Sequence, residues 1–119
     1  MSKFHKKLIA DGLCDKRGAG FCANANKLPR GEYGMVALCV KDNMLNLYDV
    51  DIKSNVGALL YQVKLSDVKC LKVHNFFLWR SLWFVYQGYE YSFNRLTSVH
   101  NSLKVIVEEY KKQFENTVY

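Results

Sequence analysis

Between about residues 34 and 94 the chain places a short apolar segment roughly every ten residues, with polar or turn-forming residues between the segments. Apolar and polar side chains alternate in several of these segments, a pattern typical of β-strands. The spacing predicts seven strands that follow one another as an antiparallel meander. The predicted strands cover residues 35–40, 44–50, 58–65, 68–73, 77–80, 82–86 and 89–93.

Two connections between these strands have the composition of tight hairpin turns. Asp42-Asn43 and Gln87-Gly88 consist of residue types that fit two-residue turns, for which Asn, Asp and Gly are favoured because they tolerate positive φ. The first predicted strand, residues 35–40, is apolar at every position, which indicates a strand covered on both faces.

One amphipathic helix is predicted to close the fold, over about residues 97–114. Thr97 or Ser98 can cap its N-terminus, and Glu109 falls on its polar side with other charged residues. The apolar side chains of this helix form a stripe along it. A stripe of this width is typical of a surface that faces a core, and we expect it to cover an open end of the strand assembly. The apolar side chains of the stripe are Val99, Leu103, Ile106, Val107, Tyr110 and Phe114.

Residues 1–33 differ in composition from the rest of the chain. A short helix is expected around residues 4–9, and the glycine and asparagine residues that follow predict loops and turns. The segment nevertheless holds too many apolar side chains for a disordered leader. We therefore expect residues 4–28 to pack across the outside of the sheet, either near Met35, Ala37 and Cys39 or near the alternating set Val36, Leu38 and Val40. The predicted division is a basic segment, 1–33, and a domain, 34–119.

The length of 119 residues allows one domain with one hydrophobic core. No apolar run approaches the ~20 residues that a membrane-spanning helix needs, and a cytoplasmic location is expected. The four cysteines, Cys14, Cys22, Cys39 and Cys70, show no C-x-x-C spacing and are expected to be reduced thiols. No metal site and no cofactor are predicted.

Three stretches together carry a family resemblance. Residues 34–48 form a hairpin that opens the meander, residues 61–68 form a strand-turn-strand step, and residues 82–93 form a hairpin followed by the helix. This order resembles the pleckstrin-homology-like (PH-like) superfold, in particular the small bacterial PH-like and GRAM-like domains. The resemblance implies a seven-stranded, bent antiparallel sheet or partly open barrel capped by one helix. It also implies a binding scaffold and not catalysis.

This sequence departs from the family pattern at one place, the first hairpin. Phosphoinositide-binding PH domains place several Lys and Arg residues around the first hairpin loop. The corresponding hairpin is taken here to be Lys41-Asp42-Asn43, which is short, has a carboxylate at its tip and offers only Lys41 to a phosphate.

The net charge of +6 is concentrated in the N-terminal segment. Residues 1–31 hold seven basic and two acidic side chains, whereas the other 88 residues hold ten basic and nine acidic ones. A basic patch attracts nucleic acid, acidic lipid and acidic protein alike. The candidate ligand-binding residues are Lys16, Arg17, Lys41 and Arg80.

Two interpretations of the aromatic stretch at residues 76–84 remain open: it belongs to the core, or it forms part of an interface. Cys14 and Cys22 lie near Lys16 and Arg17, a setting that lowers the pKa of a thiol. No partner base accompanies them, so no catalytic residue is predicted. The expected function is a non-catalytic binding or scaffolding module that engages a protein partner or an acidic membrane surface. The alternative is nucleic-acid binding through the basic N-terminal segment.

Overall fold

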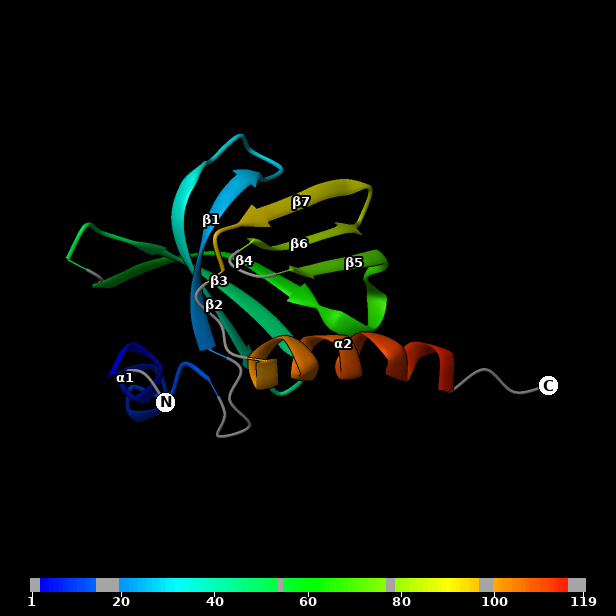
Figure 1. Cartoon of the computed structure of the whole chain (residues 1–119), viewed down its shortest axis with the longest axis horizontal. Coiled ribbons are helices and arrows are strands. Elements are labelled where there is room, and N and C mark those ends of the chain that lie inside the picture. The colour runs from blue at the N-terminus through cyan, green and yellow to red at the C-terminus, as the bar shows by residue number, and fades with distance from the viewer. Residues whose placement is uncertain (1–2, 15–19, 54, 77–78, 97–99, 116–119) are drawn as a thin grey trace.

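The computed structural model describes residues 3–14, 20–53, 55–76, 79–96 and 100–115. It contains seven strands, a short 3-10 helix (η1) and one α-helix at each end of the described chain (Figure 1). The elements in chain order are α1 (Lys3–Ala10), β1 (Gly20–Lys27), β2 (Gly34–Lys41), β3 (Met44–Val50), β4 (Val56–Lys64), η1 (Leu65–Asp67), β5 (Lys69–Phe76), β6 (Trp79–Tyr86), β7 (Tyr89–Asn94) and α2 (His100–Glu115).

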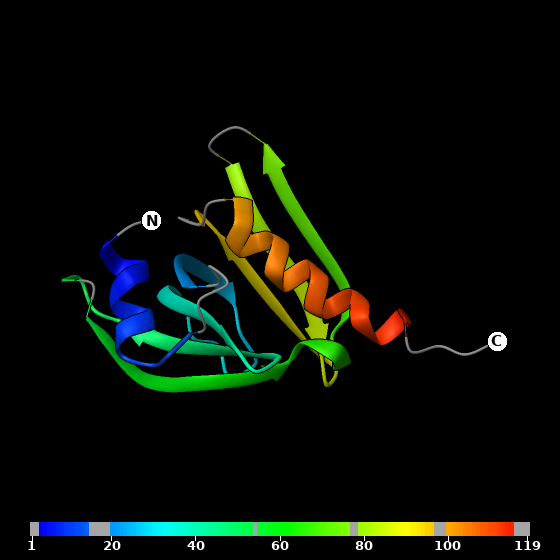
Figure 2. The same cartoon turned by 90° about the horizontal axis from the view of Figure 1, so that it is seen from below.

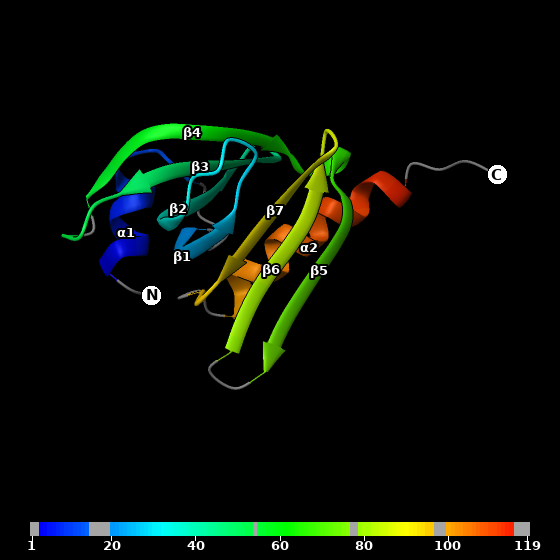
Figure 3. The same cartoon turned by 90° about the horizontal axis from the view of Figure 1, so that it is seen from above.

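The strands form one antiparallel sheet in the order β4-β3-β2-β1-β7-β6-β5. β1 joins the two halves of the sheet, because it pairs with β2 on one side and with β7 on the other. The pairing of β1 with β7 is irregular, because its register shifts between Ala25 and Lys27. The two halves of the sheet lie at a steep angle to each other (Figure 3). The predicted bent seven-stranded sheet with a C-terminal helix is confirmed, and β4 and β5 remain as edges.

Two strand predictions were wrong, although the total of seven is right. Residues 20–27 were predicted to be loop but form β1. Their alternation is regular, with Phe21, Ala23 and Ala25 buried in the core, but glycine, alanine and asparagine rarely favour strands and hid this pattern. The predicted strands 77–80 and 82–86 were divided wrongly, since Trp79–Tyr86 is one strand. Residues 77–78 lie outside the described residues.

Both predicted hairpin turns are confirmed by their backbone angles. Asp42 and Asn43 have φ values of 52° and 68°, and Gln87 and Gly88 have values of 53° and 82°. Two successive residues with positive φ make the turn whose twist matches that of the flanking strands. These local turns fix the register of β2 with β3 and of β6 with β7.

The main core lies inside the bend of the sheet and is closed by α2 (Figure 2). Its aromatic centre is Phe84, whose ring stacks on Tyr91 at 4.8 Å between centroids and lies 6.2 Å from Phe93. Leu103 and Ile106 of α2 are buried against this core.

The polar side of α2 was predicted incorrectly at one position. Glu109 is only 2% exposed, and its Oε1 accepts a hydrogen bond from Lys112 Nζ at 2.9 Å. α2 packs beside η1 as well as over the sheet, and Gln113 Nε2 donates to the Val68 carbonyl at 2.8 Å. A second side of the helix is therefore covered. The end of the predicted stripe is not, since Phe114 is 55% exposed, and Val99 lies outside the described residues.

The outer face of the β2–β3–β4 half carries a second, smaller cluster. Leu8 of α1 and Cys14 pack there with Ala37, Cys39 and Val50. The residues of β2 that alternate with these face the main core, so β2 is covered on both faces. The strand β1, by contrast, is part of the sheet and not a cover over it.

Candidate functional site

Of the four sequence-predicted ligand-binding residues, the structure describes Lys41 and Arg80 and does not bring these two together. Lys16 and Arg17 lie outside the described residues. Lys41 ends β2, and its Nζ donates to the Gly12 carbonyl at 2.9 Å. Arg80 lies near the start of β6, opposite Asn75 of β5. Two strands, β1 and β7, separate β2 from β6 in the sheet.

The first hairpin of the sheet is not the one that the sequence indicated. Because β1 precedes β2, the first hairpin loop is residues 28–33, and Lys41-Asp42-Asn43 is the second. The comparison with phosphoinositide-binding PH domains therefore concerns Lys27, Arg30 and their neighbours. The low propensity of β1 for strand structure caused this misassignment.

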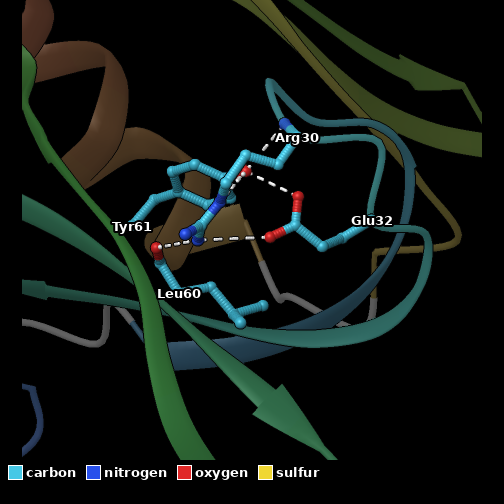
Figure 4. Close-up of polar contacts among 4 residues, drawn as sticks. All are labelled: Arg30, Glu32, Leu60 and Tyr61. Carbon is cyan, nitrogen blue, oxygen red and sulfur yellow. Dashed lines mark hydrogen bonds and ion pairs between the residues drawn. The ribbon is translucent and has the colours of Figure 1, made fainter.

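A network of polar contacts fastens this first hairpin loop to β4 (Figure 4). The hydroxyl of Tyr61 accepts hydrogen bonds from the backbone N–H and the Nε of Arg30, at 3.0 and 3.1 Å, and donates to Glu32 Oε1 at 2.6 Å. The Arg30 guanidinium also donates to the Leu60 carbonyl at 3.0 Å and lies 4.7 Å from the Tyr61 ring centre. We call these four residues the loop clip.

The loop clip keeps both of its ionic groups charged. The hydrogen bond with Tyr61, followed by the nearby Tyr61 and Glu32 charges, raises the pKa of Arg30. Burial acts to raise the pKa of Glu32, but the hydrogen bonds it accepts and the Arg30 charge outweigh burial and lower it. At the base of the same hairpin, Lys27 Nζ lies 2.5 Å from Glu90 Oε2. Both cations of the first hairpin thus have carboxylate partners, which disfavours a phosphate grip there.

Replacing Tyr61 by Phe is expected to free the loop at residues 28–33, because the phenol is the group that Arg30 and Glu32 share. The Arg30 backbone N–H loses its acceptor, so its hydrogen exchange should become faster than in the wild type. Exchange measured by NMR checks this, with the Ala37 amide in the neighbouring strand as an internal control. Equal protection of Arg30 in both proteins would contradict the role given to Tyr61.

A second surface lies on the outer face of the β5–β6–β7 half of the sheet. α2 covers the opposite face, as Figure 3 shows by the helix lying behind these strands. Trp83 is a large aromatic residue of this face, and it belongs to neither hydrophobic cluster. Residues paired directly across strands share a face. By this register the Trp83 face includes Lys27, Lys69, Lys72, Trp83, Val85, Glu90 and Ser92, and it continues through Ser81 and Asn94 to Asn24.

Basic side chains surround Trp83 on this face. Lys72 Nζ lies 5.2 Å from the centre of the Trp83 ring, a cation–π contact. Lys69 and Lys72 are exposed on the edge strand β5, and Lys27 lies beyond Ser92 on the other side. The aromatic stretch is therefore divided: Leu82 and Phe84 are core, whereas Trp83 faces outward. Sequence alternation separates these two sets but does not show which one is buried.

A small pocket opens next to the Trp83 face. Its volume is about 160 Å³. Asn24 lies opposite Asn94 of β7, whose Oδ1 is buried without a hydrogen-bond partner among the described residues. Arg95 follows directly, in the left-handed region with φ of 51°. The residues that line the pocket are Cys22, Ala23, Asn24, Met35 and Arg95.

The pKa of Cys22 is not lowered, although basic residues lie near it in the sequence. Burial raises the pKa of Cys22 to about 11, and it raises that of Cys39 to about 12, with the neighbouring thiols Cys14 and Cys22 adding to the effect. A thiol that remains protonated at neutral pH is a weak nucleophile.

Alkylation of Cys22 by iodoacetamide is expected to be slow at pH 7.5 and to accelerate as the pH approaches 11, because only the thiolate reacts. Peptide mapping by mass spectrometry measures the rate at each cysteine, with exposed Cys70 as the internal comparison. If Cys22 reacted faster than Cys70 at pH 7.5, the raised pKa would be refuted.

The ranges that the structure describes contain no helix long and apolar enough to cross a membrane. Within the same ranges, no three His, Cys, Asp or Glu side chains lie together as metal ligands would.

Comparisons with known proteins identify the fold. No family model and no curated protein matches the chain. The chain is similar to the solved structure of Inner Membrane Complex sub-compartment protein 3 (ISP3) from Toxoplasma gondii, with a TM-score of 0.51 and 14% sequence identity over 96% of this chain and 88% of that one. At this identity the similarity concerns the fold alone. That structure has a PH-like fold, and the sheet and C-terminal helix described above therefore have a PH-like arrangement.

Proposed function

We propose that this chain is a non-catalytic binding module that engages an acidic segment of a protein partner through the Trp83 face. The observation that carries the proposal is the position of Trp83, which lies outside both hydrophobic clusters on a face that α2 does not cover. Tryptophan is among the residues that dominate binding energy at protein interfaces. A PH-like fold fits a binding module in general.

The charges around Trp83 support an acidic partner. Lys72 lies over the indole, and Lys69 lies on the same strand opposite Val85. Neither lysine makes an ion pair within the described residues. Glu90, the carboxylate on this face, is paired with Lys27. Attraction of an acidic segment by these lysines would raise the association rate and weaken with salt.

A protein partner is favoured over a phosphoinositide membrane, because the cations of the first hairpin are held by Glu32 and Glu90. Nucleic-acid binding through the basic N-terminal segment stays the alternative. The structure does not test it, because Lys16 and Arg17 lie outside the described residues. An aromatic side chain with a neighbouring lysine also suits stacking of a single-stranded base. The cytoplasmic location expected from the sequence remains a prediction.

The test uses the full chain and an array of ten-residue peptides, each with four Asp or Glu residues. We expect a subset to bind at low salt, with Trp83→Ala weakening affinity about 30-fold, equivalent to the roughly 2 kcal/mol typical of an interface hot spot. Phe114→Ala, which removes an exposed aromatic on α2, is the matched control and should leave affinity unchanged.

Three results would overturn the proposal. One is the absence of any peptide that binds, and another is binding that Trp83→Ala does not weaken. The third is tighter binding of oligothymidylate or of vesicles with acidic lipid than of any peptide, which would assign the surface to another class of ligand.

A further inference from the structure

We infer that the pocket beside Arg95 receives one carboxylate of the acidic segment, so that recognition requires an acidic residue at a fixed distance from the residue that contacts Trp83. This inference rests on the proposed function and adds a specificity-determining site to it.

The pocket and Trp83 lie on the same face of the sheet. On β1, Phe21, Ala23 and Ala25 point into the main core, so Cys22 and Asn24 point outward. Asn24 pairs with Asn94 of β7, and Asn94 pairs with Ser81 of β6. Ser81 lies two residues from Trp83 along the same strand. A ligand lying on this face can therefore reach both places.

Arg95 differs from the two cations of the first hairpin, Lys27 and Arg30, in its surroundings. Lys27 and Arg30 have carboxylate partners, whereas Arg95 has none among the described residues. Arg95 is exposed and lines a pocket of about 160 Å³, together with the less polar Met35 and Cys22. A guanidinium binds a carboxylate by two parallel hydrogen bonds.

Asn94 adds a second polar requirement at the same place. Its Oδ1 is buried without a partner in the described part of the chain, and its register partner Asn24 lines the pocket. A buried acceptor left unpaired is unfavourable. A peptide segment supplies backbone N–H groups as well as carboxylates, and a rotation of the Asn94 amide toward the pocket would pair it with such a donor.

The spacing of the two anchors follows from sheet geometry. Asn24 lies two strands and two residues away from Trp83, which corresponds to about 12 Å for strands about 4.8 Å apart and a rise of about 3.3 Å per residue. In an extended peptide, side chains at positions i and i+4 point to the same side and lie about 13 Å apart. The acidic residue should therefore stand four positions from the residue that contacts Trp83.

The experiment starts from a peptide that binds the full chain and replaces each Asp or Glu in turn by its amide. One replacement should weaken binding of the wild type about tenfold. The same replacement should have less than a twofold effect in Arg95→Asn, because the interaction is already absent. Asparagine tolerates the left-handed backbone at this position, so the variant should keep its fold. Lys104→Gln, which removes an exposed and paired cation of α2, is the matched control and should not change the pattern.

NMR supplies an independent measurement. The peptide should shift the signals of the Cys22 amide and the Asn24 side-chain amide in the wild type, and much less when its critical carboxylate is replaced. If Trp83→Ala abolishes binding but Arg95→Asn leaves affinity and pattern unchanged, the pocket inference is wrong while the proposed function stands. If Trp83→Ala has no effect, or no peptide binds, both fail.

Discussion

A chain that lacks residues 1–28 is expected to lose its fold. The deletion removes β1, which pairs with β2 on one side and β7 on the other and so holds the two halves of the sheet together. It also removes Phe21 and Leu28 from the core, both 3% exposed, together with Leu8 from the outer cluster. Each large apolar side chain contributes roughly 1.5–3 kcal/mol when buried. The combined loss approaches the whole stability of a typical domain, about 5–15 kcal/mol.

Circular dichroism and thermal melting measure this effect. The matched control is a chain that lacks only residues 1–10, which removes α1 but keeps β1. It should still fold, with a lower melting temperature, because Ala37, Cys39 and Val50 lose the cover of Leu8. A cooperative melt of the longer deletion near the temperature of the full chain would show that the N-terminal segment is a passive tail.

Phe84→Ala should be among the most destabilising single substitutions, by about 3–5 kcal/mol. Phe84 is fully buried, its ring stacks on Tyr91 with an interplanar angle of 14°, and it lies at the centre of the core that α2 closes. Removal of the ring leaves a cavity between the sheet and the helix, which the rigid sheet cannot collapse to fill.

Urea denaturation followed by circular dichroism gives the free energy of unfolding for this comparison. Phe114→Ala is the control, since Phe114 is 55% exposed and its ring makes an edge contact with Tyr110. Its cost should be about 1 kcal/mol or less. Equal losses for the two variants would contradict the assignment of Phe84 to the centre of the core.

Residues adjacent in the chain were sufficient to predict the hairpin turns and several of the strands. The Asp42-Asn43 and Gln87-Gly88 turns depend on which residues tolerate positive φ, and the structure shows that φ at all four positions. The strand β3 was predicted with its observed bounds, Met44–Val50. The apolar composition of residues 35–40 indicated that both faces of that strand are covered, which the two clusters on β2 show.

Contacts between distant residues decided what the sequence alone did not. β1 is a strand because β2 and β7 pair with it, and its small residues carry little propensity of their own. Because β1 is a strand, the loop of the first hairpin is residues 28–33. In this loop Arg30 and Glu32 form hydrogen bonds with Tyr61, which lies 31 and 29 residues away in the chain.

The sequence determined the order of most elements, the hairpin turns and the closing helix, because these depend on periodicity and on backbone angles set by adjacent residues. Tertiary structure alone decided the central strand, the burial of Glu109 and the outward direction of Trp83. Alternation along β6 separates Trp83 from Leu82 and Phe84, but only the position of α2 determines which set faces the core. The candidate binding face is therefore a property of the fold, since burial depends on what packs against a strand from elsewhere in the chain.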